Sequence, residues 1–180
     1  MPRTTRRVGA AALAAVAFAA VTGCSQQGRQ YAVPKKICDV RVSEDALEPL
    51  LPDGEKLNQS QRPIGESQTA CVVNVADGPY ALNIDIIELD KPLTADDKRV
   101  SLKSLKHAKS VRVPDAHWAV QGDNHFHLST SCGTDWADSL AFRFTFGKGE
   151  KGVEASRGNA LRFVKEFVRG EKEEEGCTAR

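Results

Sequence analysis

Five cysteines constrain the fold of this chain more than any other residue type. They are Cys24, Cys38, Cys71, Cys132 and Cys177, and no two of them lie close together in the 180-residue sequence. This spacing excludes the Cys-x-x-Cys motif of redox proteins and the paired cysteines of a zinc knuckle. Each cysteine is therefore expected either to carry a covalent attachment or to form half of a disulfide. The N-terminal sequence indicates which role applies to Cys24.

The first 23 residues have the layout of an export signal. Three arginines, Arg3, Arg6 and Arg7, precede an Ala-rich apolar run from Val8 to Val21. That run is 14 residues long, whereas a membrane-spanning helix needs ~20. Segment 1–23 is therefore predicted to be a signal peptide that directs export.

The end of this leader carries a motif. Val21-Thr22-Gly23-Cys24 resembles the lipobox of bacterial lipoproteins. The resemblance implies cleavage before Cys24, a diacylglycerol on its thiol, and retention on the extracytoplasmic face of the cell membrane. Residues 24–36 are polar, and they are predicted to form a flexible tether between the lipid and the domain. The alternative is an ordinary secretory signal in which Cys24 is incidental.

The other four cysteines form an even set in an exported chain, so two disulfides are expected. Three connectivities are possible. Cys38–Cys71 with Cys132–Cys177 is favoured, because each bridge then joins a helix to the start of a strand in its own half of the domain. No cofactor is expected besides the covalent lipid.

Residues 37–180 are predicted to form a single α+β domain. The order of elements is α-β-β-α-β-β-β-α, with about five strands in an antiparallel sheet and three helices on one face. A bulge near Ile86 is expected, because Ile87 and Leu89 are out of phase with the preceding apolar residues. Gly170 is expected to follow the last helix as its C′ residue. The expected helices are 43–51, 94–108 and 154–169, the strands are 71–75, 80–89, 117–121, 125–130 and 140–146, and 53–69 is a loop.

The alternation of side chains predicts the register of one hairpin. A three-residue loop pairs Trp118 with Leu128 and Val120 with Phe126, which collects all four apolar side chains on one face. A two-residue loop would set Val120 opposite His127 and mix the faces, so it is disfavoured.

The same register places three histidines, His117, His125 and His127, together on the opposite face. Imidazoles at this spacing can share a metal ion, with Asp115 or Asp123 as an oxygen ligand. The simpler interpretation is a polar, solvent-exposed strand face, which would respond to pH because histidine titrates near neutrality.

Charge and motifs exclude several functions. Without the three arginines of the leader, 25 basic residues against 24 acidic become 22 against 24, so the domain lacks the basic excess of a nucleic-acid binder. Gly65-Glu66-Ser67 lacks the second glycine of a nucleophile elbow. The glycine-rich segment 147–152 lacks the spacing of a phosphate-binding loop. No catalytic constellation is visible, so an enzyme is not predicted.

Taken together, the chain resembles small secreted lipoproteins of actinobacteria. The resemblance rests on the leader with its lipobox, on Cys38 followed by a short helix, and on Cys71 opening a strand. We expect a membrane-anchored, non-catalytic module that binds an envelope protein or a small ligand. The alternative is a metal- or small-ligand-binding protein, enzymatic or not, that uses the face with His117, His125 and His127.

Overall fold

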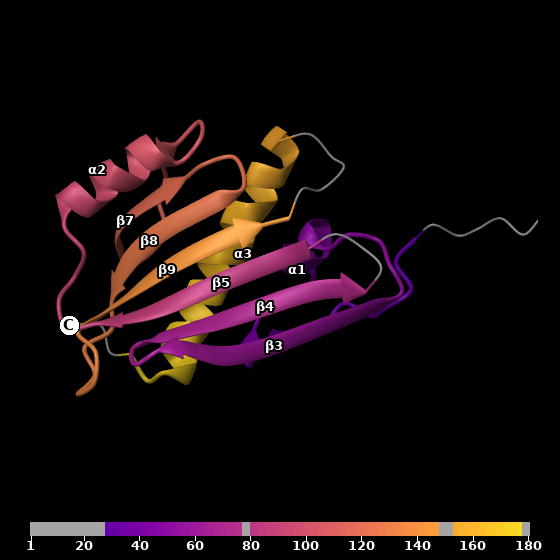
Figure 1. The fold of residues 1–180 in the computed structure, drawn as a ribbon, viewed down its shortest axis with the longest axis horizontal. Coiled ribbons are helices and arrows are strands. Elements are labelled where there is room, and N and C mark those ends of the chain that lie inside the picture. The colour runs from indigo at the N-terminus through magenta and orange to yellow at the C-terminus, as the bar shows by residue number, and fades with distance from the viewer. Residues whose placement is uncertain (1–27, 77–79, 148–152, 178–180) are drawn as a thin grey trace, which may run out of the picture.

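The computed structural model describes residues 28–76, 80–147 and 153–177 (Figure 1). Within these ranges the chain forms a seven-stranded antiparallel sheet, a separate pair of short strands and three α-helices. The strands of the large sheet lie in the order β3-β4-β5-β9-β8-β7-β6. The strands are β1 Lys36–Ile37, β2 Val40–Arg41, β3 Lys56–Gly65, β4 Gln68–Ala76, β5 Tyr80–Leu89, β6 Lys109–Ser110, β7 Ala116–Gln121, β8 His125–Ser131 and β9 Ser139–Phe146. The helices are α1 Glu44–Leu47, α2 Ala95–Ser104 and α3 Val153–Glu174, with a 3-10 turn η1 at Glu48–Leu50.

This architecture confirms an α+β domain built on an antiparallel sheet, but the sheet is larger than the predicted five strands. The main addition is β3, which lies within residues 53–69, so the prediction of a loop there is wrong. β3 is an edge strand that pairs only with β4, and all its side chains are exposed except the half-buried Leu57. A strand exposed on both faces shows no apolar alternation, which is the signal that sequence reasoning needs.

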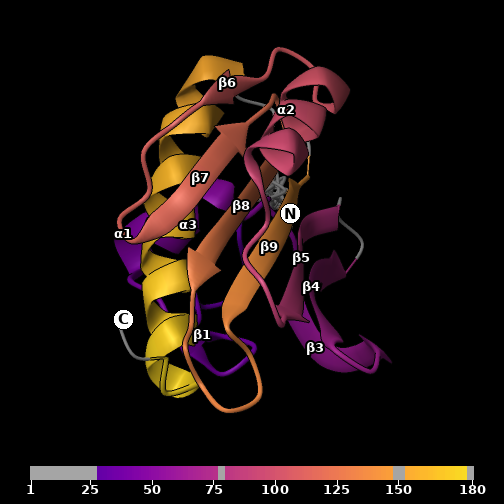
Figure 2. The same cartoon turned by 90° about the vertical axis from the view of Figure 1, so that its left-hand side faces the viewer.

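The two long helices lie on opposite faces of the sheet (Figure 2). On one face, Phe142 and Phe144 of β9 meet Phe167 of α3 at ring-centroid distances of 6.5 and 5.7 Å. On the other face, Ser101 of α2 reaches His127 of β8. The prediction that the helices share one face is therefore wrong for α2.

Cover on both faces explains the mixed alternation in β5. Ile84 and Ile86 are buried on the α3 face, whereas Ile87 and Leu89 lie beneath α2. The predicted bulge near Ile86 is absent, because β5 pairs with β9 in unbroken register along this stretch. Out-of-phase apolar residues here mark a second covered face and not a change of register.

The β7–β8 hairpin has the register that the alternation argument disfavours. Trp118 lies opposite Ser129 and Val120 lies opposite His127, so the predicted pairing of Trp118 with Leu128 is wrong. That prediction assumed that only one face of the hairpin is buried. Because α2 covers the second face, apolar side chains are stabilised on both.

Both predicted disulfides are confirmed. Cys38–Cys71 joins the segment before α1 to β4, with a Cα–Cα distance of 5.9 Å. Cys132–Cys177 joins the loop after β8 to the segment after α3, with a Cα–Cα distance of 4.4 Å. The two bridges thus attach the N-terminal segment and the C-terminal helix to the sheet.

The second half of the predicted tether, 24–36, packs on the domain. Arg29 donates hydrogen bonds to the backbone carbonyls of Glu48 and Leu51, at 2.9 and 2.8 Å. β1 then begins at Lys36 and pairs with β2. The chain from Arg29 onward is therefore part of the folded domain and not a free linker.

α3 continues past Gly170, so the expectation that this glycine ends the helix is wrong. A Cβ atom at Gly170 would lie 2.8 Å from Cγ1 of Val40 and 3.0 Å from the carbonyl oxygen of Arg41. The glycine therefore allows α3 and β2 to approach each other closely. Gly158, in the same helix, has no atom within 4 Å of the corresponding position.

This contrast yields a prediction with an internal control. Gly158→Ala should raise the free energy of unfolding by about 0.5–1 kcal/mol, since alanine is the better helix former. Gly170→Ala should lower it by about 1–3 kcal/mol, because the added methyl group overpacks the contact with β2. Urea denaturation of the two variants would measure this. Equal effects of the same sign would contradict the close packing of Gly170.

Candidate functional site

A pocket of about 420 Å³ lies between α2 and the sheet. Ile87 and Leu89 of β5 and Ala141 of β9 contribute apolar side chains from the sheet, and Trp118 contributes its indole from β7. Val100 of α2 also lines the pocket and is 64% exposed. The pocket is therefore largely apolar and opens to solvent beside α2.

The pocket exists because α2 is a polar helix that does not pack closely against the sheet. Ser101 is its only buried residue. A helix that packs by an apolar stripe would fill the space beneath it with large side chains. α2 is instead held by polar contacts before its first turn, in its middle and after its last turn.

The N-terminus of α2 is held by a capping box. The carboxylate of Asp97 accepts hydrogen bonds from the backbone N and the Oγ1 of Thr94, at 2.7 and 2.8 Å. These bonds hold the pKa of Asp97 below its usual value. Just before the cap, the carbonyl of Leu93 accepts a hydrogen bond of 3.3 Å from Nε1 of Trp118. The start of α2 is thereby tied to β7.

The middle of α2 is tied to β8 through His127. Nδ1 of His127 lies 3.2 Å from Oγ of Ser101, within hydrogen-bond distance. Burial lowers the pKa of His127 to about 4, and the positive charge of Arg143 acts in the same direction. His127 is therefore neutral at physiological pH and serves as a hydrogen-bonding part of the pocket lining.

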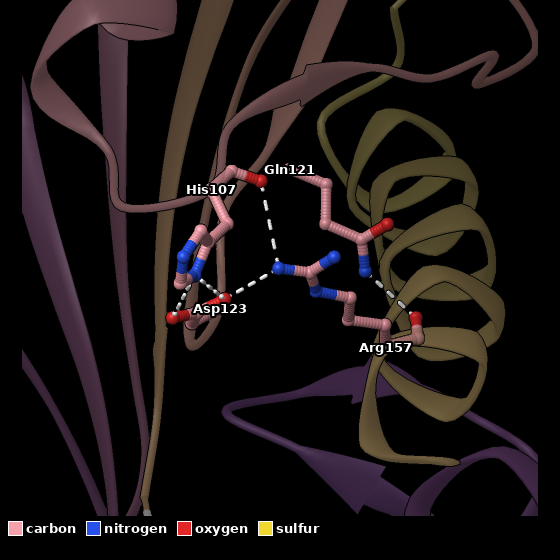
Figure 3. Close-up of polar contacts among 4 residues, drawn as sticks. All are labelled: His107, Gln121, Asp123 and Arg157. Atoms are coloured by element: carbon pink, nitrogen blue, oxygen red, sulfur yellow. Dashed lines mark hydrogen bonds and ion pairs between the residues drawn. The ribbon is translucent and has the colours of Figure 1, made fainter. Parts of the chain in front are cut away.

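The loop after α2 is anchored by a polar network (Figure 3). Nδ1 of His107 lies 2.9 Å from Oδ2 of Asp123, and the other carboxylate oxygen, Oδ1, accepts a hydrogen bond from the Arg157 guanidinium of α3. Hydrogen bonds from His107, together with those from Arg157, keep the pKa of Asp123 below its usual value. Gln121 completes the network by donating to the Arg157 carbonyl at 2.7 Å. The network therefore joins the α2–β6 loop, the β7–β8 turn and α3.

This His107–Asp123 pair does not form a nucleophilic triad within the part of the chain described. A triad needs a serine, threonine or cysteine hydrogen-bonded to the second ring nitrogen of the histidine. The only side chain that hydrogen-bonds to the ring of His107 in the described ranges is Asp123, through Nδ1. We therefore assign the network a positioning role at the C-terminal end of α2.

Each of the three histidines that sequence reasoning grouped together lies within hydrogen-bond distance of a different side chain. His127 faces Ser101, Nδ1 of His125 lies 3.2 Å from Oγ1 of Thr145, and Nε2 of His117 lies 3.1 Å from Oγ of Ser131. His117 sits at the register shift of β7, which removes the expected alignment with β8.

No group of three His, Cys, Asp or Glu residues arranged to hold a metal ion occurs in the described ranges. The predicted set of His117, His125 and His127, with Asp115 or Asp123, is thus not gathered into one site. Of the three histidines, only His127 lines the pocket.

Sequence reasoning missed the pocket, although one signal pointed to it. Ile87 and Leu89 are apolar residues on the wrong face of a one-sided sheet, and both line the pocket. Interpreting them as a second buried face would have indicated that another element covers β5. The residues that α2 contributes carry no such signal, because they are mostly polar.

Comparison with known proteins identifies no relative from which the function could be inferred. No family model matches the chain, and neither the curated proteins nor the solved structures include a significant match. Among the described residues, no helix combines the length and the apolar character that crossing a bilayer requires.

The neutral His127 predicts a pH dependence of stability. Its pKa is about 4 in the folded protein and 6.5 ordinarily, so the unfolded chain binds a proton first as the pH falls from 6.5 toward 4. The stability that His127 contributes should therefore be lost over that window. Burial of Glu171 has the opposite effect: its pKa is raised to about 7 from 4.5, so its contribution is lost as the pH rises through 7.

The comparison of wild type with His127→Gln isolates this effect. The difference in unfolding free energy between the two proteins should be smaller at pH 5 than at pH 7, as measured by urea denaturation. Glu171→Gln is the control and should change the pH profile with the opposite sign. A wild type minus His127→Gln difference that is independent of pH would contradict burial of a neutral imidazole.

Proposed function

We propose that this chain is a lipid-anchored, extracytoplasmic, non-catalytic domain that binds a small ligand in the pocket under α2. The pocket carries the proposal. Its volume of about 420 Å³ lies within the range of ~300–1,000 Å³ that is typical of small-molecule sites. An apolar lining with a few convergent polar groups is also the usual composition of such sites.

The cysteine inventory supports the lipid anchor. Of the five cysteines, four are paired with each other in the two disulfides. No cysteine of the same chain is left to pair with Cys24, which is the residue that the lipobox resemblance selects for acylation. A diacylglycerol supplies two acyl chains, which give stable membrane binding where one chain gives only marginal binding.

The packing of Arg29 sets how the anchored domain would stand on the membrane. Five residues lead from Cys24 to Arg29, and an extended chain of that length spans at most ~17 Å. The end of the domain near Arg29 would therefore face the bilayer. In Figure 1 the described chain starts at the right-hand end of the molecule and α2 lies toward the left. The pocket would thus lie away from the membrane attachment, open to ligands in the surrounding medium.

The small-ligand part of the second hypothesis is included in this proposal. His127, one of the three histidines considered, lines the pocket with its ring held by Ser101. The metal part has no supporting arrangement within the described residues.

The anchor is tested by changing Cys24. In the native host, Cys24→Ala should move the protein from the membrane fraction to the soluble fraction, because the acylated thiol is lost. Intact mass spectrometry of the wild type should show a chain that begins at Cys24 and carries acyl mass. Ser25→Ala is the matched control and should remain in the membrane fraction. A soluble, unmodified wild-type form would refute lipid anchoring.

The pocket is tested by filling it. N-phenyl-1-naphthylamine, a neutral apolar fluorophore, should bind to the purified disulfide-bonded domain with an increase in emission. Ser104 is exposed and lines the pocket from α2, so Ser104→Trp should weaken binding by about tenfold or more by occupying the space. Lys103→Trp adds the same ring next to it, at a residue that does not line the pocket. Equal binding by the two variants would contradict the proposed site.

A further inference from the structure

We propose that the pocket under α2 selects an amphipathic anion, with its apolar body beneath α2 and its carboxylate, sulfonate or phosphate group on Arg143. This inference rests on the proposed function, since it names the class of ligand for the same pocket. The hydrogen-bond partners of the polar side chains that line the pocket support it.

Every other polar side chain in the described lining is already hydrogen-bonded within the protein. Asp97 accepts from Thr94, Ser104 donates to the Ser101 carbonyl, and the indole of Trp118 donates to Leu93. The remaining hydroxyl and the imidazole, those of Ser101 and His127, bond to each other. These groups shape the pocket, but each has a partner before any ligand arrives.

Arg143 is the exception. It belongs to β9, lines the pocket and is exposed. Its guanidinium makes no hydrogen bond and no ion pair with any residue in the described ranges. Asp85 lies directly opposite it on β5, but no ion pair joins the two, and Asp85 instead accepts from Asn83 at 3.2 Å. Arg143 therefore presents five N–H donors and a full positive charge at the pocket.

The charges around the pocket favour an anion over other ligands. The one carboxylate in the described lining, that of Asp97, is occupied by the capping box. His127 is neutral, so Arg143 is the cationic side chain in the described lining. A cationic ligand would be repelled by the guanidinium, and a neutral ligand would leave the guanidinium without a charged partner. Charge-assisted hydrogen bonds to an anion are roughly twice as strong as neutral ones.

The shape of the pocket selects an anion with an apolar body and not a bare inorganic ion. Ile87, Leu89 and Trp118 offer no partner to a small hydrated anion, and they gain from burying apolar surface. Val100, exposed at the opening, extends this apolar surface toward solvent. Arg143 and the apolar wall can be satisfied together only by a molecule that carries both kinds of group.

Two related fluorophores test the inference. 1-Anilinonaphthalene-8-sulfonate and N-phenyl-1-naphthylamine share one ring system and differ in the sulfonate. The wild type should bind the sulfonated probe about tenfold more tightly than the neutral probe. Arg143→Met should remove that preference by weakening only the sulfonated probe. Arg143→Lys should keep part of it, because the charge remains without the planar fork.

Arg62→Met is the matched control. Arg62 lies on β3 in the same cross-strand row as Arg143, through Ala70 and Asp85, and it does not line the pocket. Arg62→Met changes the net charge by the same amount as Arg143→Met, and it should leave the affinities for both fluorophores unchanged. Thermal denaturation verifies that each variant is folded.

The outcomes separate this inference from the proposed function. If the wild type binds neither probe, the pocket itself is refuted. Two results would overturn the anion inference while the pocket stands: equal wild-type affinities for the two probes, or an unchanged ratio of the two affinities in Arg143→Met.

Discussion

Strands β5, β9 and β7 carry apolar side chains on both faces, and this double burial determines how the rest of the chain is arranged. On one face, Phe142 and Phe144 of β9 pack against Phe163 and Phe167 of α3 with edge-to-face geometry. Aromatic pairs of this kind add to the stabilisation that comes from apolar burial. The other face is covered by α2, and the two-sided cover sets the register of the β7–β8 hairpin.

The two faces are covered by different physical means. α3 is amphipathic and buries large side chains, Phe163 and Phe167 among them, against the sheet. α2 buries only Ser101 and is held by the Thr94 capping box, by His127 and by the His107–Asp123–Arg157 network. Since these contacts are made at fixed points, they support α2 above the sheet without filling the gap. The same polar character that makes α2 a weak packing element thereby makes the pocket.

The parts of the fold that sequence reasoning predicted are those with strong local signals. The first two expected helices start at Ser43 and Thr94, and both residues act as N-caps in the structure, an effect that depends on only a few neighbouring residues. The disulfide pairs followed from the placement of each cysteine beside a predicted element. β3 was missed because an exposed edge strand needs no apolar residues. The end of α3 was placed too early because Gly170 was interpreted as a helix end, whereas a glycine is needed there for the close contact with β2.

The candidate site was less predictable than the fold. The three histidines were grouped by an assumed register, and a shift of one residue in a strand moves its side chains to the other face. Arg143 gave no signal at all, because a lone arginine in an alternating strand is ordinary. Its significance lies in the absence of a partner among the described residues, and partners across a sheet are not visible along a chain.

The sequence by itself determined the α+β class and the two bridges, and it is the source of the predictions of an export leader and of lipidation at Cys24. Each of these depends on residues close together in the chain or on residue types with few possible uses. Only the tertiary structure decided that α2 lies on the face opposite α3, that the second half of the predicted tether packs on the domain, and that Arg143 opens onto an apolar pocket. Those features depend on contacts between segments that are far apart in the chain. Long-range packing determines such contacts, and no local sequence pattern encodes them.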